Sequence, residues 1–167
     1  MTHLPLRSVD VSADGAAVYE RWLSDVEARL ADPSGDRNEL VRDALREIYF
    51  PALAPDQDES RLPAGTRAAL TSLDPRGATL EPEYYRDIDP ERYYPRKPLI
   101  WFWQMFDRSA LGGNVHLGVR LRRLLAPHVF RKVGENFKAF HFVEVTFGYN
   151  LEVGDNVVVH RNVLLDD

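Results

Sequence analysis

The side chains that could act on a substrate gather near the end of the sequence. His160, Arg161 and Asn162 follow a short apolar stretch, and Asp166 and Asp167 come after a second one. An imidazole titrates near neutral pH, and imidazole, amide and carboxylate groups all form hydrogen bonds with hydroxyl groups. These residue types therefore fit contact with a polar small molecule. The alternative is that they simply face solvent on the protein surface.

Other reactive side chains are few. The chain has no cysteine, which excludes disulfides, thiolate metal sites and cysteine nucleophiles. His141 lies between two phenylalanines at a position expected to face outward, which favours a surface or intersubunit histidine over a chemical role. The sequence therefore predicts no metal site and assigns no catalytic residue. Three further histidines have no partner motif: His3, His116 and His128.

The segment that must position these side chains carries a six-residue period. Gly134 and Gly154 belong to two similar phrases, Val-Gly-Glu-Asn-Phe-Lys and Val-Gly-Asp-Asn-Val-Val. A short fixed period of this kind is typical of a parallel β-helix, in which each hexad supplies one strand and one corner. With a two-residue slip before the fourth hexad, the inward first positions are Val133, Ala139, Val145, Val153, Val159 and Leu165.

The corner and fifth positions support the same interpretation. Asn or Gly, which tolerate a positive φ, occupies four of the five corners, and Phe142 occupies the other. The alternative is an antiparallel meander with Gly-containing turns, which would alternate polar and apolar residues with a period of two. The four corner residues of the expected type are Asn136, Gly148, Asn156 and Asn162. The fifth positions, also expected to point inward, are Phe137, Val143, Tyr149, Val157 and Val163.

The stretch 147–156, Phe-Gly-Tyr-Asn-Leu-Glu-Val-Gly-Asp-Asn, followed by His160, Arg161, Asn162 and the Asp166–Asp167 pair, resembles the first coils of the hexapeptide-repeat acyltransferases. It is most similar to sugar O-acetyltransferases of the galactoside and maltose type. The resemblance covers about residues 130 to 167. It implies a left-handed β-helix, a homotrimer, acetyl-CoA or another acyl-CoA as donor, and an active site between neighbouring subunits.

The resemblance also implies roles for individual residues. His160 takes a position at which the family usually has an acceptor-binding Asn, and Asp166 and Asp167 fall where it has carboxylates near the acceptor. We therefore expect acceptor contacts from His160, Asn162, Asp166 and Asp167. The family's general-base histidine, which deprotonates the acceptor hydroxyl, lies on a later coil. We expect this chain to be a fragment that is inactive alone.

Composition fits a cytoplasmic protein of one or two domains, with 44% hydrophobic residues, 28% charged residues and no signal-peptide pattern. Residues 96–138 hold 9 Lys or Arg against 2 Asp or Glu, whereas residues 1–95 hold 11 against 19. The basic block could contact CoA phosphates, acidic lipid or nucleic acid. The favoured alternative is pairing with acidic helices of the same chain. Arg120, Arg122 and Arg123 come without a nucleic-acid-reading motif, so nucleic-acid binding is not predicted.

Residues 1–130 read as helices separated by turns. A stripe recurring every four residues predicts a helix capped by Asp14 and ended by residues 32–35, and Asp36 with Glu39 predicts the capping box of a second helix that ends before Pro51. Residues 66–73 look helical and residues 74–77 form a turn. The first stripe is Val18, Trp22, Val26 and Leu30, and the second is Leu40, Ala44, Leu45 and Ile48.

Two aromatic segments complete this region. Tyr84, Tyr85, Tyr93 and Tyr94 lie among prolines, which indicates an extended segment that packs on a surface or lines a sugar site. The apolar run 99–106, with Pro98 in its first turn, predicts a buried helix too short to span a bilayer. With Leu117, Leu121, Leu124 and Leu125 it could instead form a membrane-surface patch.

We therefore expect an α+β fold with a helical domain over residues 1–130 and the start of a left-handed parallel β-helix over residues 131–167. The expected function is acyl-CoA-dependent O-acyl transfer to a sugar-like hydroxyl. Two other classes stay open: a non-catalytic oligomerisation or docking module, and a peripheral membrane protein.

Overall fold

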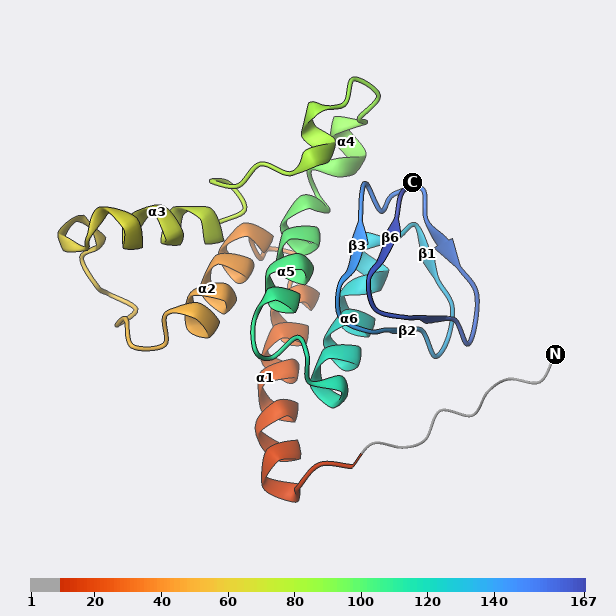
Figure 1. Ribbon diagram of the computed structural model, residues 1–167, viewed down its shortest axis with the longest axis horizontal. Coiled ribbons are helices and arrows are strands. Elements are labelled where there is room, and N and C mark those ends of the chain that lie inside the picture. Colours follow the sequence, from red (N-terminus) through yellow and green to blue (C-terminus); the bar gives the residue numbers. More distant parts are fainter. Residues whose placement is uncertain (1–9) are drawn as a thin grey trace.

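Helices are followed by short parallel strands in the computed structural model, which describes residues 10–167 and has an α+β fold (Figure 1). The helices end at Val129, and the first strand begins at Lys132. His3 lies outside the described residues. The helices are α1 (Ala13–Ala31), α2 (Arg37–Tyr49), α3 (Ala64–Leu73), α4 (Pro90–Tyr93), α5 (Lys97–Arg108) and α6 (Val115–Val129), with 3₁₀ helices η1 (Glu59–Arg61) and η2 (Glu81–Tyr84) between them. The strands are β1 (Lys132–Val133), β2 (Lys138–Ala139), β3 (Val143–Val145), β4 (Glu152–Val153), β5 (Val158–Val159) and β6 (Val163–Leu165).

The first two helices begin at side-chain caps. The predicted cap of α1 at Asp14 was wrong, because Ser12 is the cap and its Oγ accepts a hydrogen bond from the N–H of Gly15 at 3.2 Å. Asp14 lies two residues after the cap, in the first turn of α1, where a carboxylate interacts favourably with the positive end of the helix dipole. Asp36 caps α2 as predicted, since its side chain accepts from the N–H of Asn38 at 2.8 Å. The capping box predicted with Glu39 does not form in the described chain, where the Glu39 side chain makes no bond to the N–H of Asp36.

The apolar stripe of α1 is buried over only part of its length. Val26 and Leu30 are 2% and 7% exposed, and Leu23 beside them is also buried. Val18 is 61% exposed and Trp22 is half-buried. The prediction of one packed stripe is therefore correct for the C-terminal half of α1 and wrong for Val18.

Residues 81–94 are not the extended segment that the sequence suggested. They contain η2 and α4, which project from the helical layer in Figure 1. Pro82 and Pro90 stand in the first turns of these helices, where a fixed φ favours helix initiation. Asp89 caps α4 by accepting from the N–H groups of Glu91 and Arg92. These local signals outweigh the prolines' usual association with extended chain.

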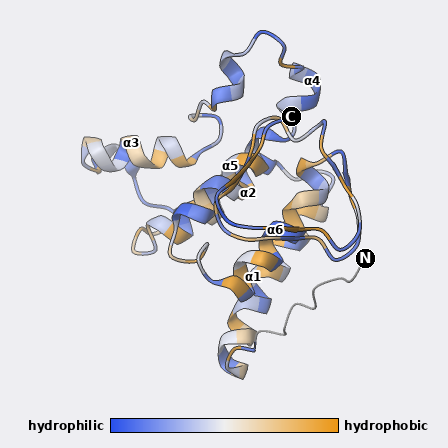
Figure 2. Cartoon of the chain, turned by 45° about the vertical axis from the view of Figure 1, so that its right-hand side comes forward, coloured by the Kyte–Doolittle hydropathy of each residue, from blue (hydrophilic) through white to orange (hydrophobic). Residues whose placement is uncertain are grey.

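The apolar helix α5 is buried as predicted. Leu99, Phe102 and Phe106 are fully buried, and Trp103 is 2% exposed. Leu117, Leu121 and Leu125 of α6 are also buried, so this group does not form the membrane-facing patch weighed as an alternative. Among residues 10–167, no helix combines the length and apolarity needed to cross a bilayer. Figure 2 shows hydrophobic segments in orange along α1, α5 and α6.

The strands form three two-stranded parallel sheets, β1 with β4, β2 with β5 and β3 with β6. This pairing contradicts the antiparallel meander. Facing residues are 20 positions apart, and they include the expected first positions of the hexads: Val133 with Val153, Ala139 with Val159 and Val145 with Leu165. All five corners have a positive φ: Asn136, Phe142, Gly148, Asn156 and Asn162. Phe142 therefore has the backbone conformation expected of a corner and differs from the other corners only in residue type.

The inner run of strands shares the hydrophobic core of the helices. Phe137, Ala139 and Val143 are at most 1% exposed, and they belong to the same buried cluster as α5 and α6. Their counterparts in the outer run, Val157 and Val163, are only half-buried. The core is thus continuous across residue 130.

A buried ion pair ties α5, α6 and the strands together. Asp107 Oδ1 accepts from Arg122 Nε at 2.9 Å, and Asp107 Oδ2 accepts from the N–H of Phe142 at 2.7 Å. Arg122 also donates to the carbonyls of Gly112 at 2.8 Å and Ala139 at 3.2 Å. Burial raises the pKa of Asp107, and the hydrogen bonds from Arg122 and Phe142 oppose that rise. The corner at Phe142 is therefore fastened to the helices.

Candidate functional site

The four predicted acceptor residues fall into two groups at opposite ends of β6. His160 and Asn162 precede this strand, and Asp166 and Asp167 follow it. A three-residue strand spans about 10 Å, at roughly 3.3 Å per residue. A single hydroxyl group therefore contacts one group or the other, and only an extended acceptor would reach both.

His160 is held by an aromatic ring of the preceding coil. Its imidazole stacks on Phe140 with ring centroids 5.6 Å apart and an interplanar angle of 8°. Asn162, at the adjacent corner, has φ 60°, a conformation that Asn adopts more readily than most residues. The positive φ of this corner thus explains why an Asn occupies position 162. His160 remains exposed beside Phe140.

Asp167 is committed to the backbone of the neighbouring turn. Its Oδ1 accepts from the N–H groups of Phe147 at 2.9 Å and Gly148 at 2.8 Å, and its Oδ2 accepts from that of Asn150 at 3.0 Å. The side chain of Asn150 returns a bond to the Asp167 carbonyl at 2.8 Å. A carboxylate with three backbone donors serves to order the turn at residues 147–150.

Asp166 is exposed and is bonded to the residue that precedes Phe147. Thr146 Oγ1 donates to Asp166 Oδ1 at 2.9 Å. The pKa of Tyr85 is raised, chiefly by its hydrogen bond to Glu81, and the negative charge of Asp166 makes a smaller contribution. Tyr85 is 40% exposed. The structure therefore joins two features that the sequence kept apart, the carboxylates and the tyrosine segment.

Phe147 completes this group. Its ring meets that of Tyr85 edge to face, with centroids 6.3 Å apart and an angle of 72°. We call Tyr85, Phe147, Thr146 and Asp166 the aromatic corner. It combines a partly exposed ring, in contact with Phe147, and a carboxylate, bonded to Thr146, that can accept hydrogen bonds from hydroxyl groups.

Residues in and next to α4 hold the aromatic corner in place, and of these the sequence analysis singled out Tyr93 but not Asp89 or Arg92. Arg92 donates to the carbonyl of Tyr149 at 2.6 Å, and its guanidinium lies 4.3 Å from the centre of the Tyr149 ring. The Tyr149 hydroxyl accepts from the N–H of Asp89 at 3.1 Å. The ring of buried Tyr93 meets Phe147 edge to face. The Asp89-Pro90 pair, a recognised helix-start signal, could have predicted α4 but not these contacts.

Five cations of the basic segment 96–138 form ion pairs within the chain, which agrees in part with the predicted pairing to acidic helices, because Glu144 and Glu152 lie on strands. Arg123 donates to the carbonyl of Phe137 at 2.8 Å. These cations are therefore a poor fit for CoA phosphates, and no CoA contact is assigned to them. The ion pairs are Arg122–Asp107, Arg120–Glu20, Arg108–Glu144, Lys97–Glu83 and Arg131–Glu152.

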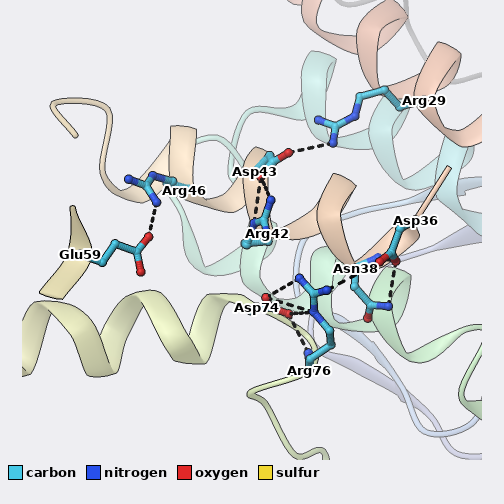
Figure 3. A network of polar contacts seen from close by, with 9 residues as sticks. All are labelled: Arg29, Asp36, Asn38, Arg42, Asp43, Arg46, Glu59, Asp74 and Arg76. Atoms are coloured by element: carbon cyan, nitrogen blue, oxygen red, sulfur yellow. Dashed lines mark hydrogen bonds and ion pairs between the residues drawn. The ribbon is translucent and has the colours of Figure 1, made fainter. Parts of the chain in front are cut away.

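A cleft of about 1230 Å³ between α2 and α3 contains a polar network (Figure 3). Each of the three arginines that line the cleft is ion-paired inside the chain, and Arg46 also donates to the carbonyl of Ala54 at 3.0 Å. This network fastens the α3 region to α2 and leaves little reason to expect an anionic ligand. The pairs are Arg42–Asp43, Arg46–Glu59 and Arg76–Asp74.

Comparisons of the chain with protein-family models, with curated proteins and with solved structures found no match. In the part of the chain that the structure describes, no three His, Cys, Asp or Glu side chains gather closely enough to hold a metal ion. The choice of a candidate site therefore depends on the contacts within the chain, and we take the aromatic corner as the candidate site.

Proposed function

We propose that this chain acts in an acyl-CoA-dependent O-acyltransferase of the hexapeptide-repeat class, with acetyl-CoA as donor, a sugar-like hydroxyl as acceptor and a cytoplasmic location. The strands of residues 131–167 are proposed to begin a left-handed parallel β-helix. Support comes from the 20-residue offset between paired strands, the positive φ at every corner and the inward apolar residues. The handedness rests on the family resemblance.

The observation that carries the proposal is that Phe147 contacts the ring of Tyr85 while the residue before it, Thr146, binds Asp166. An apolar ring face and a carboxylate held by two consecutive residues suit a sugar, which presents C–H groups on one face and hydroxyls around its edge. In this proposal Asp166 orients the acceptor and Tyr85 supports its ring. His160 and Asn162 contact only an acceptor long enough to extend along β6, and Asp167 acts by shaping the turn.

Acceptor binding can be measured directly on this chain. We expect methyl glycosides to give saturation-transfer NMR signals, and Tyr85→Ala and Asp166→Asn each to weaken binding about tenfold, as loss of a charge-assisted hydrogen bond or of ring contact would do. Tyr84→Ala is the matched control, because Tyr84 is 79% exposed on the same segment. Equal losses in all three variants, or no glycoside signal, would reject the acceptor site.

The catalytic half of the proposal has a separate test. Family resemblance assigns the general base to a histidine that this sequence does not contain, so we expect no thiol release from acetyl-CoA when acceptor is added to this chain. Sustained thiol release that depends on acceptor would show that a group within residues 1–167 performs the deprotonation, with His160 the first to replace by Gln.

A second candidate is an oligomerisation or docking module. The described residues pair β4, β5 and β6 on one edge only, and the inward side chains Val157 and Val163 of this outer run are half-buried. Unpaired strand edges with apolar side chains are sites for further pairing. Sedimentation equilibrium distinguishes the candidates: a stable oligomer without glycoside binding favours docking, whereas glycoside binding by a homotrimer favours the transferase.

A further inference from the structure

A second concave site lies away from the strands, where α1, the end of α2 and the turn between α5 and α6 meet. Its volume is about 570 Å³, within the range of about 300–1,000 Å³ common for small-molecule sites. Three of the lining residues are polar: Glu47, Arg108 and Ser109. The other nine are Val18, Tyr19, Trp22, Ile48, Tyr49, Pro51, Ala110, Leu111 and Leu117.

The hydroxyls of the two lining tyrosines are already bonded within the chain. The Tyr19 hydroxyl accepts from Asn114 Nδ2 at 3.1 Å, and the Tyr49 hydroxyl donates to the carbonyl of Met105 at 2.7 Å. Trp22 stacks on Phe106, with centroids 6.0 Å apart and an angle of 19°, so its indole is fixed on one side. These rings therefore present mainly carbon surface to the cavity.

The cavity also explains why the apolar stripe of α1 is only partly buried. Its apolar stripe passes from the core at Val26 and Leu30 to the cavity at Trp22 and Val18. Val18 is 61% exposed although it continues the stripe. An exposed apolar stripe that runs into a concave site is typical of ligand-binding surfaces.

The charges around the cavity favour a neutral occupant. The two charged lining residues, Glu47 and Arg108, have opposite signs, so the lining carries no net formal charge. We propose that this cavity binds a neutral, ring-containing apolar small molecule, which would lie against Trp22 and Tyr49 and cover Val18. This site is separate from the aromatic corner, and its occupancy does not depend on acyl transfer.

The test uses N-phenyl-1-naphthylamine, an uncharged dye whose emission rises in apolar sites. We expect saturable one-to-one binding to the full chain. Val18→Lys should weaken it at least tenfold by placing a charge at the mouth, and Ala110→Trp should weaken it by filling the cavity. Both positions are exposed, so both variants should keep the wild-type circular dichroism spectrum.

Leu164→Lys is the matched control, because Leu164 is 60% exposed on β6 and lines no part of this cavity. Dye binding unchanged by Leu164→Lys supports the site, and equal losses in Val18→Lys and Leu164→Lys overturn it as surface adsorption. Ligand charge is tested by competition with tert-butylbenzene and its cationic isostere phenyltrimethylammonium. Stronger displacement by tert-butylbenzene supports the neutral ligand class, and stronger displacement by the cation overturns it.

Discussion

Phe142 shows how a residue can take a conformation that its type disfavours. Its φ is 58°, in the region that L-residues other than Asn, Asp and Gly seldom adopt. The N–H of Phe142 is held by Asp107, which lies 35 residues earlier on α5 and is itself held by Arg122. The six-residue period predicted a corner here, but the residue type did not, because the stabilising contact is distant in sequence.

Replacing Phe142 by Asn should stabilise the protein. The left-handed conformation costs roughly 1–2 kcal/mol for a residue such as Phe and less for Asn, and Phe142, at 41% exposed, contributes less burial than a core phenylalanine. We expect Phe142→Asn to raise the free energy of unfolding by about 1 kcal/mol in urea titrations. Asn162→Ala replaces an Asn by a residue that disfavours a positive φ at the equivalent corner of the next coil. It should lower the free energy of unfolding by a similar amount. A destabilised Phe142→Asn would mean that the ring's packing outweighs the backbone strain.

At the scale of elements, local capping signals were a partial guide. Asp36 caps α2 as predicted and accepts from the N–H of Asn38, whereas the cap of α1 is Ser12 and not the predicted Asp14. The short helices η2 and α4 were missed because the prolines of that segment were read as breakers of helix, although Pro90 follows the cap Asp89 and belongs to the first turn. Capping chemistry was thus the better guide than composition.

The cap of α2 should make stability depend on acid pH. Its hydrogen bond with the N–H of Asn38 contributes to holding the pKa of Asp36 below 3.8, so the folded state favours the carboxylate. That stabilisation is present above about pH 3.8 and is lost as pH falls through the lowered pKa. We expect Asp36→Ala to cost about 1 kcal/mol at pH 7 and less at pH 2.5. Asp36→Asn keeps a good cap without a charge, so its stability difference from Asp36→Ala should not shrink in acid.

At the scale of the molecule, the sequence predicted two successive regions, and the structure joins them through one core. The period of 131–167 and the stripes of the helices were each readable because they repeat locally. The contact of Tyr85 with Phe147 was not readable, since these residues are more than 60 positions apart and no repeat relates them. The candidate site is therefore a product of how the two regions pack.

This shared core predicts that the strands and helices unfold together. Phe137 is fully buried against Phe130, with ring centroids 5.7 Å apart, and all three tryptophans lie on helices. Phe137→Ala should cost about 3–5 kcal/mol through lost burial and a cavity. In a cooperative unit, that cost lowers the urea midpoint of the tryptophan fluorescence transition and of the circular dichroism transition equally. Leu164→Ala, at an exposed site of β6, should move neither. A tryptophan transition that stays in place in Phe137→Ala would instead show that the helices fold without the strands, and the aromatic corner would then form only after an independent helical region has folded.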